Sequence, residues 1–220
     1  MLANSLVELF KHGGYIMWPI LVVAIVSIAI VGERCVWWIR ESSRRQPERL
    51  EKVLAALENG DFPEAARQSS ESQDPVVRMI WHGLNHVNSS LQGALQVAAG
   101  AEIKRAGRFL MVMDTCITVA PLLGLLGTVT GIMSAFSKVG GELAIEGVSA
   151  GIGEALIATA AGLGIAIFNL VPFNFLTERV SKLQFELETA ATNVEVMVNK
   201  AKRQGFDTVD FRRESSVQNR

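Results

Sequence analysis

The chain has 220 residues, 49% of them hydrophobic, and its 21 basic side chains nearly balance its 22 acidic ones. A soluble domain of this length would spread its apolar residues periodically, but here they gather in three blocks, Tyr15–Gly32, Phe109–Phe136 and Gly147–Leu176. Each block is long enough to cross a hydrocarbon core of about 30 Å as a helix. The sequence therefore predicts an all-α integral membrane protein with three transmembrane helices and argues against a soluble fold.

The first block is predicted to be a retained membrane anchor. Its apolar run is longer than that of a signal peptide, and no small-residue cleavage motif precedes Glu33-Arg34. Trp18 and Trp37 would lie about 28 Å apart along a helix, which matches the separation of the two aromatic belts of a membrane.

The positive charges predict the orientation. The 21 Lys and Arg residues divide as 1 before the first block, 11 between residues 33 and 108, 1 after the second block and 8 from residue 177 onward. Because positive charge stays on the cytoplasmic side, we expect residues 35–108 and the C-terminal tail inside. The N-terminus and the loop after the second block are then outside.

The segment between the first two blocks is predicted to be helical. One amphipathic helix is expected from Pro47 to a stop at Asn59-Gly60, with residues 65–73 as a possible continuation followed by a loop. A second is expected to begin at Asp74-Pro75.

Two longer helices are predicted to leave the membrane. No strong breaker separates Leu91 from Pro121, so one helix is expected to run through that proline to Phe136, about 69 Å in all. The third block likewise continues past Pro172, where a kink is expected, into another amphipathic helix. The tail from Gly205 is expected to be disordered.

This organisation gives three transmembrane helices, two of which extend into a cytoplasmic helical stalk. The predicted segments are a short periplasmic N-terminus (1–14), transmembrane helix 1 (15–34), a cytoplasmic helical domain (35–108), transmembrane helix 2 (109–136), a periplasmic loop (137–147), transmembrane helix 3 (148–176), and a cytoplasmic C-terminal helix and tail (177–220).

Glu154 is the only ionisable residue of the third block. A charged side chain in a membrane helix is unfavourable by about 2.5–3.5 kcal/mol on insertion scales, so it usually faces a partner, a cavity or an ion path. Thr128 and Thr159 are predicted at similar depth, in the outer half or the centre of the bilayer. The three side chains could form a polar path for protons. Alternatively, Glu154 bonds across helices, and each threonine bonds to its own helix.

Small residues recur every three or four positions in the second and third blocks, for example at Gly124, Gly127 and Gly131. Such spacing lets transmembrane helices approach closely. It predicts tight packing within the chain, and it suggests oligomerisation as well.

The remaining polar features do not indicate an enzyme. His82 and His86 are four residues apart, but HGLNH lacks the glutamate of a zinc-protease motif, so no metal site is expected. Cys35 and Cys116 are interpreted as packing residues, and Asp114 is expected to be solvated or paired with Arg108. The sequence has no phosphate loop, no nucleophile elbow, and no basic patch with interleaved aromatics that would bind nucleic acid. We therefore expect no catalytic residue and no cofactor.

Three motifs resemble those of the MotA/TolQ/ExbB proton-channel family. APLLGLLGTVTGI (Ala120–Ile132) is similar to the family's second-span motif, and GIGEALIATAAGLGIAI (Gly151–Ile167) to its third-span motif. GGYIMWPILVVAIVSIAIVGER (Gly13–Arg34) resembles the first span of ExbB-type members. The resemblance covers about residues 5–200 and all three spans in order.

The resemblance implies a function, partners and a location in the bacterial cytoplasmic (inner) membrane. Family members form a pentamer around a pore that holds the transmembrane helices of an ExbD/TolR-like partner, each with an essential aspartate. Proton-motive force then drives work in the periplasm, with protons as the coupling ion, most often for TonB-dependent uptake in ExbB-like members. The family's polar pore positions match Glu154, Thr128 and Thr159 here.

Two alternatives stay open. The short N-terminus resembles that of TolQ-type chains, which would serve a TolA-like protein in envelope maintenance rather than a TonB-like one. A structural membrane scaffold that conducts no protons is the alternative from a different class. It predicts that Glu154 and both threonines tolerate replacement.

Overall fold

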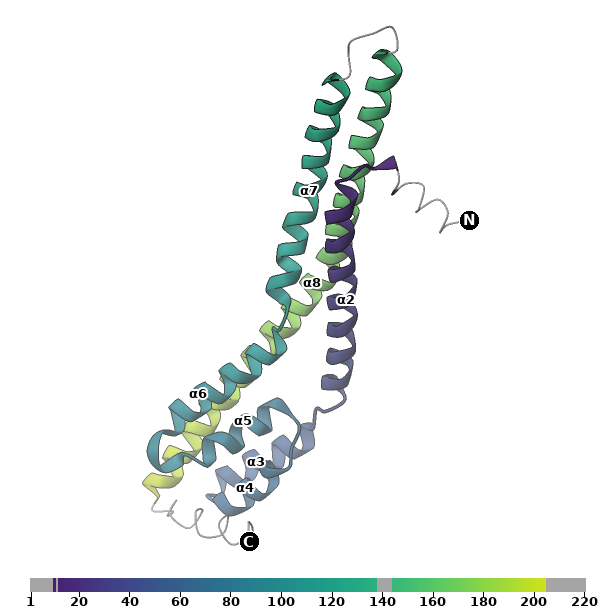
Figure 1. The fold of residues 1–220 in the computed structure, drawn as a ribbon. Helices are drawn as coiled ribbons and strands as arrows, with labels where there is room; N and C mark the ends of the chain where they lie inside the picture. Colours follow the sequence, from purple (N-terminus) through teal and green to yellow (C-terminus); the bar gives the residue numbers. More distant parts are fainter. Residues whose placement is uncertain (1–9, 11, 138–143, 205–220) are drawn as a thin grey trace, which may run out of the picture. The chain divides into compact units, whose positions relative to one another are not determined.

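The computed structural model describes residue 10, residues 12–137 and residues 144–204. These parts of the chain are helical and contain no strand (Figure 1). The helices are α2 (Met17–Ser42), α3 (Pro47–Glu58), α4 (Phe62–Ser70), α5 (Pro75–Leu84), α6 (Val87–Ala106), α7 (Leu110–Ser137) and α8 (Ala144–Arg203). Most of the predicted N-terminal segment, most of the predicted periplasmic loop and the tail from Gly205 lie outside the described residues.

The chain divides into two compact units. The membrane unit consists of the described parts of Met1–Val36 and Phe109–Leu176, and the α3–α6 unit of the described parts of Trp37–Arg108 and Thr177–Arg220. In the part of the chain that the structure describes, three helices are long and apolar enough to cross a membrane. The prediction of an all-α protein with three membrane-spanning helices is confirmed.

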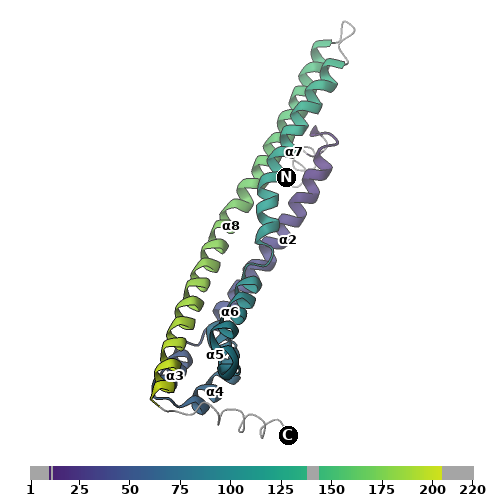
Figure 2. The ribbon, with the colours of Figure 1, turned by 90° about the vertical axis from the view of Figure 1, so that its left-hand side faces the viewer.

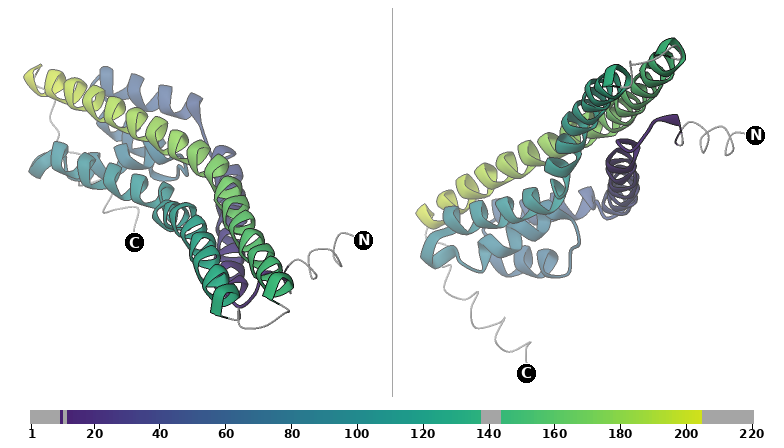
Figure 3. Two further views of the ribbon diagram at one scale, coloured as in Figure 1. Left: turned by 90° about the horizontal axis from the view of Figure 1, so that it is seen from above. Right: turned by 45° about the horizontal axis from the view of Figure 1, so that its top comes forward.

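Within the membrane unit, α7 and the first part of α8 lie side by side in every view (Figure 2, Figure 3), and α2 lies alongside them. Both α7 and α8 continue through their internal prolines, Pro121 and Pro172. Because a membrane offers no hydrophobic driving force between helices, the close packing of this unit depends on small residues at the contacts.

The predicted continuous helix from Leu91 to Phe136 is wrong at residues 107–109. Helix α6 ends at Ala106 with Gly107 as its C-cap, and α7 begins at Leu110. Between them Phe109 adopts a φ of 67°, which is unfavourable for a non-glycine residue. Its ring lies 5.7 Å from the guanidinium carbon of Arg34, a cation–π contact that favours this arrangement.

The α3–α6 unit has its own hydrophobic core. Helix α4 is separate from α3 rather than its continuation, because Asp61 caps it by accepting a hydrogen bond of 3.0 Å from the Glu64 amide. Asp74 caps α5 in the same way, accepting from the Val76 amide at 2.9 Å. The most buried core residues are Val53, Leu57, Ala65, Val77, Met79, Ile80, Leu187, Val194 and Val198.

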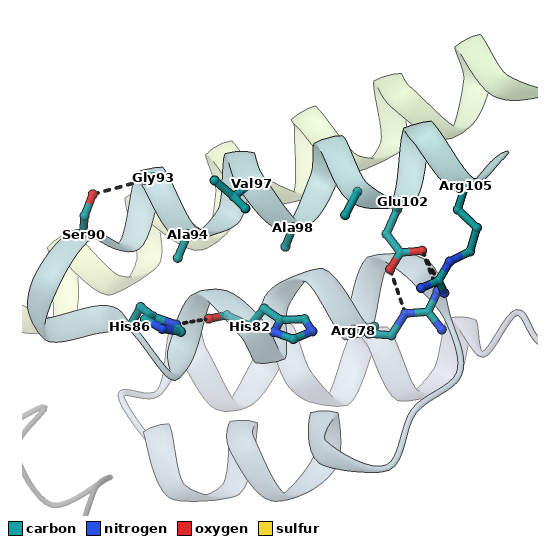
Figure 4. Close-up of a pocket in the computed structure, with 11 residues that line it drawn as sticks. Arg78, His82, His86, Ser90, Gly93, Ala94, Val97, Ala98, Glu102 and Arg105 are labelled. Carbon is teal, nitrogen blue, oxygen red and sulfur yellow. Dashed lines mark hydrogen bonds and ion pairs between the residues drawn. The ribbon is translucent and has the colours of Figure 1, made fainter. Parts of the chain in front are cut away.

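An open pocket of about 520 Å³ lies between α5 and α6 (Figure 4). At one end Arg78 donates two hydrogen bonds, of 2.8 and 2.5 Å, to the buried carboxylate of Glu102. These bonds raise the pKa of Arg78 above its usual range. Along the pocket, His86 donates from Nδ1 to the His82 carbonyl oxygen at 3.0 Å. Arg78 and Glu102 thus bond to each other, and His86 bonds to the backbone.

Removing Arg78 is expected to loosen this unit. Among the described residues, Arg78→Ala leaves the buried Glu102 carboxylate with Arg105 as its one ion-pair partner, 3.7 Å away, and we expect a loss of about 2 kcal/mol of stability. Amide hydrogen exchange on the full-length protein should show faster exchange in α5 and α6.

Arg67→Ala is the matched control. Arg67 bonds Glu64 at the surface and thereby lowers the pKa of that carboxyl to about 2. Because both groups remain hydrated, exchange in α4 should change little. Equal exchange rates in the two variants would contradict the assigned role of the α5–α6 ion pair.

Candidate functional site

A line of glycines brings the backbones of α7 and α8 into contact. A methyl group at Gly124 would lie 2.9 Å from Thr159 Cα, and one at Gly131 would lie 3.0 Å from Ala155 Cβ. On the facing helix, a methyl group at Gly162 would overlap the Ala120 carbonyl oxygen. The predicted role of the small residues in packing within the chain is confirmed at these positions.

Thr159 bonds across this interface. Its Oγ1 donates to the Gly124 carbonyl oxygen of α7 at 2.9 Å, and also lies 3.2 Å from the Ala155 carbonyl oxygen of its own helix. The close approach at Gly124 is what brings a carbonyl of one span within reach of a hydroxyl on the other. Thr159 therefore links α7 to α8 at this level.

Thr128 bonds within its own helix. Its Oγ1 donates to the Leu125 carbonyl oxygen at 2.6 Å, and its side chain is half-buried. The register of the two helices places it near the level of Ala155 and Ala158, because these residues face Gly131 and Gly127. Thr128 thus lies within about a turn of Glu154 in depth.

Glu154 lies against the start of the first span. A methyl group at Gly14 would overlap its Oε1 and would lie 3.1 Å from its Cγ. Gly14 has a φ of 71° and accepts a turn hydrogen bond of 3.2 Å from the Met17 amide, at the start of α2. The Glu154 side chain is half-buried, and among the described residues its carboxylate has no hydrogen bond or ion pair.

The three predicted residues are close in depth, but they do not bond to one another within the chain. Glu154 and Thr159 are five residues apart, which turns their side chains about 140° from each other around α8. Thr159 therefore faces α7, and Glu154 faces the turn at Gly14. Of the three side chains, only the Glu154 carboxylate has no hydrogen-bond partner among the described residues.

Both α7 and α8 extend beyond the start of α2 (Figure 1, Figure 2). Glu154 is level with Gly14, which is followed by the aromatic residues Tyr15, just before α2, and Trp18, in the first turn of α2. Such aromatic residues favour a membrane–water interface. The carboxylate is therefore level with the beginning of the first span.

Gly14 is the site residue that the sequence interpretation missed. The Gly13-Gly14 pair before the first apolar block is a local signal for a turn with positive φ. Its contact with Glu154 joins residues far apart in the chain, so no local pattern could reveal it.

Gly14→Ala is expected to displace the Glu154 side chain. The new methyl group meets the carboxylate, and the positive φ adds about 1–2 kcal/mol of strain. Reaction of Glu154 with dicyclohexylcarbodiimide, followed by mass spectrometry, should change several-fold in rate.

Gly32→Ala is the control further along the first span, on α2, because no described atom outside its own turn of helix lies within 4 Å of the position of its methyl group. It should leave the labelling rate unchanged. An unchanged rate in Gly14→Ala would contradict the contact.

Other expected features have mixed outcomes. Cys116 is buried as expected of a packing residue, but Cys35 is exposed. Asp114 is exposed, and its pairing with Arg108 stays a prediction.

The sequence of this chain is similar to those of known membrane proteins. The model of the MotA/TolQ/ExbB proton channel family matches residues 71–189. "Putative biopolymer transport protein ExbB-like 1" of Synechocystis sp. is 33% identical over 187 residues, which are 80% of this chain and 72% of the relative. "Putative biopolymer transport protein ExbB homolog" of Methanothermobacter thermautotrophicus is 31% identical over 80% of this chain and 64% of its own length. "Tol-Pal system protein TolQ" of Haemophilus influenzae is 39% identical over 93 residues, 41% of each chain.

Proposed function

Because the chain belongs to the MotA/TolQ/ExbB proton channel family and is ExbB-like, we propose that it is the channel subunit of an energy-transducing motor. The family is one of membrane channel and transport subunits rather than enzymes. In this proposal proton-motive force across the inner membrane drives work in the periplasm or at the outer membrane. The coupled process is TonB-dependent uptake.

The observation that carries the proposal is the position of Glu154 and its lack of a hydrogen-bond partner among the described residues. It is the only ionisable residue of its apolar block, and in the described chain it is half-buried without a partner. A carboxylate in that position is unfavourable unless another group or water completes its hydrogen bonds. An intramembrane aspartate on a second, single-span protein of the ExbD/TolR type would exchange protons through it.

The proposed path begins on the outer side. Glu154 is level with the start of the first span, so with the N-terminus outside it would receive protons from the periplasm. Thr159 and Thr128 lie at nearby levels and would hydrogen-bond the partner's aspartate as it passes. Rotation of the Thr159 hydroxyl away from the Gly124 carbonyl would free it for this role.

The proposed assembly is a pentamer around the partner's helices. In the single chain α7 exposes large apolar residues, among them Leu122, Leu125, Met133 and Phe136. Such a surface fits lipid or neighbouring helices. The α3–α6 unit would lie in the cytoplasm, on the side where the positive charges are concentrated.

Native mass spectrometry of the protein purified in detergent from its own host tests the assembly. Five copies with a small single-span partner would support the motor. A monomer or dimer without such a partner would overturn it and favour a scaffold.

A TolQ-like role in envelope maintenance is the second candidate, supported by the 39% identity to a TolQ protein over 93 residues. The two pathways differ in the periplasm-spanning protein that they engage. Affinity purification of the cross-linked complex distinguishes them, since the uptake role predicts a TonB-like protein and the envelope role predicts a TolA-like one.

A further inference from the structure

Two buried oxygens inside the membrane unit have no hydrogen-bond partner among the described residues. They are Oγ of Ser27 on α2 and Oδ1 of Asn169 on α8, whose residues are 1% and 0% exposed. Asn169 uses only its amide nitrogen, which donates to the Ile165 carbonyl oxygen at 2.8 Å. In a membrane interior an unsatisfied oxygen is unfavourable, so these two atoms call for a common explanation.

The contacts at the outer end of the unit fix the register of its three helices. A methyl group at Gly127 of α7 would lie 2.7 Å from Ala158 Cβ on α8 and 3.4 Å from Ile16 Cγ2 at the start of α2. These three residues therefore form one layer. Eleven residues along a helix make about three turns and about 16 Å, so such a step returns to the same face.

A step of eleven residues leads from the layer of Ile16, Gly127 and Ala158 to the residues that carry the two unpartnered oxygens. Ser27 follows Ile16 by eleven residues, and Asn169 follows Ala158 by eleven residues. Helix α7 runs in the opposite direction, and eleven residues before Gly127 it carries Cys116. Cys116 is also buried, at 6% exposure, and its thiol is a weak hydrogen-bonding group.

Contacts on either side of Ser27 and Cys116 support this register. Four residues after Ile16, Ile20 belongs to one apolar cluster with Leu123, which lies four residues before Gly127. Eighteen residues after Ile16, Arg34 contacts Phe109, which lies eighteen residues before Gly127. Ser27 and Cys116 fall between these two contacts.

We propose that Ser27, Cys116 and Asn169 form a polar layer that binds one water molecule between the three spans. The water donates to Oδ1 of Asn169 and exchanges a hydrogen bond with Oγ of Ser27, which satisfies both buried oxygens. A buried water needs two to four polar partners, and this layer supplies them. The layer holds α2 in register with the α7–α8 pair, and it lies about 16 Å from the Ile16 layer next to Glu154.

Thiol cross-linking tests the juxtaposition. In the full-length protein with Cys35→Ser, Ser27→Cys should be bridged to the native Cys116 by dibromobimane, which fluoresces when both of its ends react. Ile28→Cys is the control, because that neighbouring side chain is 61% exposed and should give no intrachain bridge. Equal fluorescence from the two variants, or none from Ser27→Cys, would overturn the layer.

A thermodynamic cycle tests the shared hydrogen bonds. Ser27→Ala and Asn169→Leu should each lower the Tm of the purified assembly by a few degrees. Their double variant should lose less than the sum of the two, because both changes remove one network. Ser27→Ala combined with Ser134→Ala, whose site is exposed, should be additive. Additive losses in the first pair would overturn the coupling.

A density map of the assembly that resolves ordered water tests whether a water molecule occupies the layer. It should show a peak within hydrogen-bonding distance of both oxygens. A direct hydrogen bond between Ser27 and Asn169 with no such peak would overturn the water site.

Discussion

Glu154→Gln is expected to abolish proton-driven work while leaving the assembly intact. The amide keeps the shape of the side chain and most of its packing beside Gly14, but it cannot release a proton. We expect at least a hundredfold loss of activity when the variant replaces the native chain in a deletion strain of its own host. The phenotype of that strain and the oligomer size of the purified variant are measured together.

Glu178→Gln provides the matched control on the same helix. Glu178 is exposed and bonds Lys182 at 2.7 Å, and that bond lowers the pKa of the Glu178 carboxyl. Its replacement removes a carboxylate outside the apolar block and should leave activity unchanged. Full activity of Glu154→Gln would contradict a proton role for Glu154 and would favour the scaffold.

Gly162→Ala is expected to separate α7 from α8. A methyl group at this position would overlap the Ala120 carbonyl oxygen and would lie 3.2 Å from its carbonyl carbon and 3.3 Å from Gly124 Cα. All of these atoms belong to the backbone, so no side chain can rotate away to make room. The helices must move apart, which weakens the Thr159–Gly124 hydrogen bond and costs about 2 kcal/mol.

Gly164→Ala is the matched control two residues further along α8. No described atom outside its own turn of helix lies within 4 Å of the position of its methyl group, and alanine favours a helix over glycine by about 1 kcal/mol. Thermal unfolding in detergent, followed by tryptophan fluorescence, should give a lower Tm for Gly162→Ala and an equal or higher one for Gly164→Ala. Equal Tm values for the two variants would contradict the close contact at Gly162.

The three spans and their small residues could be predicted because they depend on local composition. Eighteen or more apolar residues specify a membrane helix, and the spacing of Gly124, Gly127 and Gly131 specifies a face for close packing. The separate helix α4 also had a local signal, the Asp61 cap followed by Pro63, which the interpretation of residues 65–73 did not use.

Other features depend on residues distant in sequence. The break before α7 places Phe109 at positive φ beside Arg34, and neither residue alone predicts it. Glu154 could be found from its isolation in an apolar block. Its neighbour at Gly14 could not, because that contact depends on the register between the first and third spans.

Proton flux into liposomes is the measurement that tests the central claim most directly. The assembly purified with its single-span partner is reconstituted, a potassium diffusion potential is imposed, and the internal pH is followed with a trapped dye. We predict faster acidification with the native assembly than with the Glu154→Gln assembly, which should match empty liposomes. Equal flux through the native and Glu154→Gln assemblies would contradict the assignment of Glu154 to the proton path.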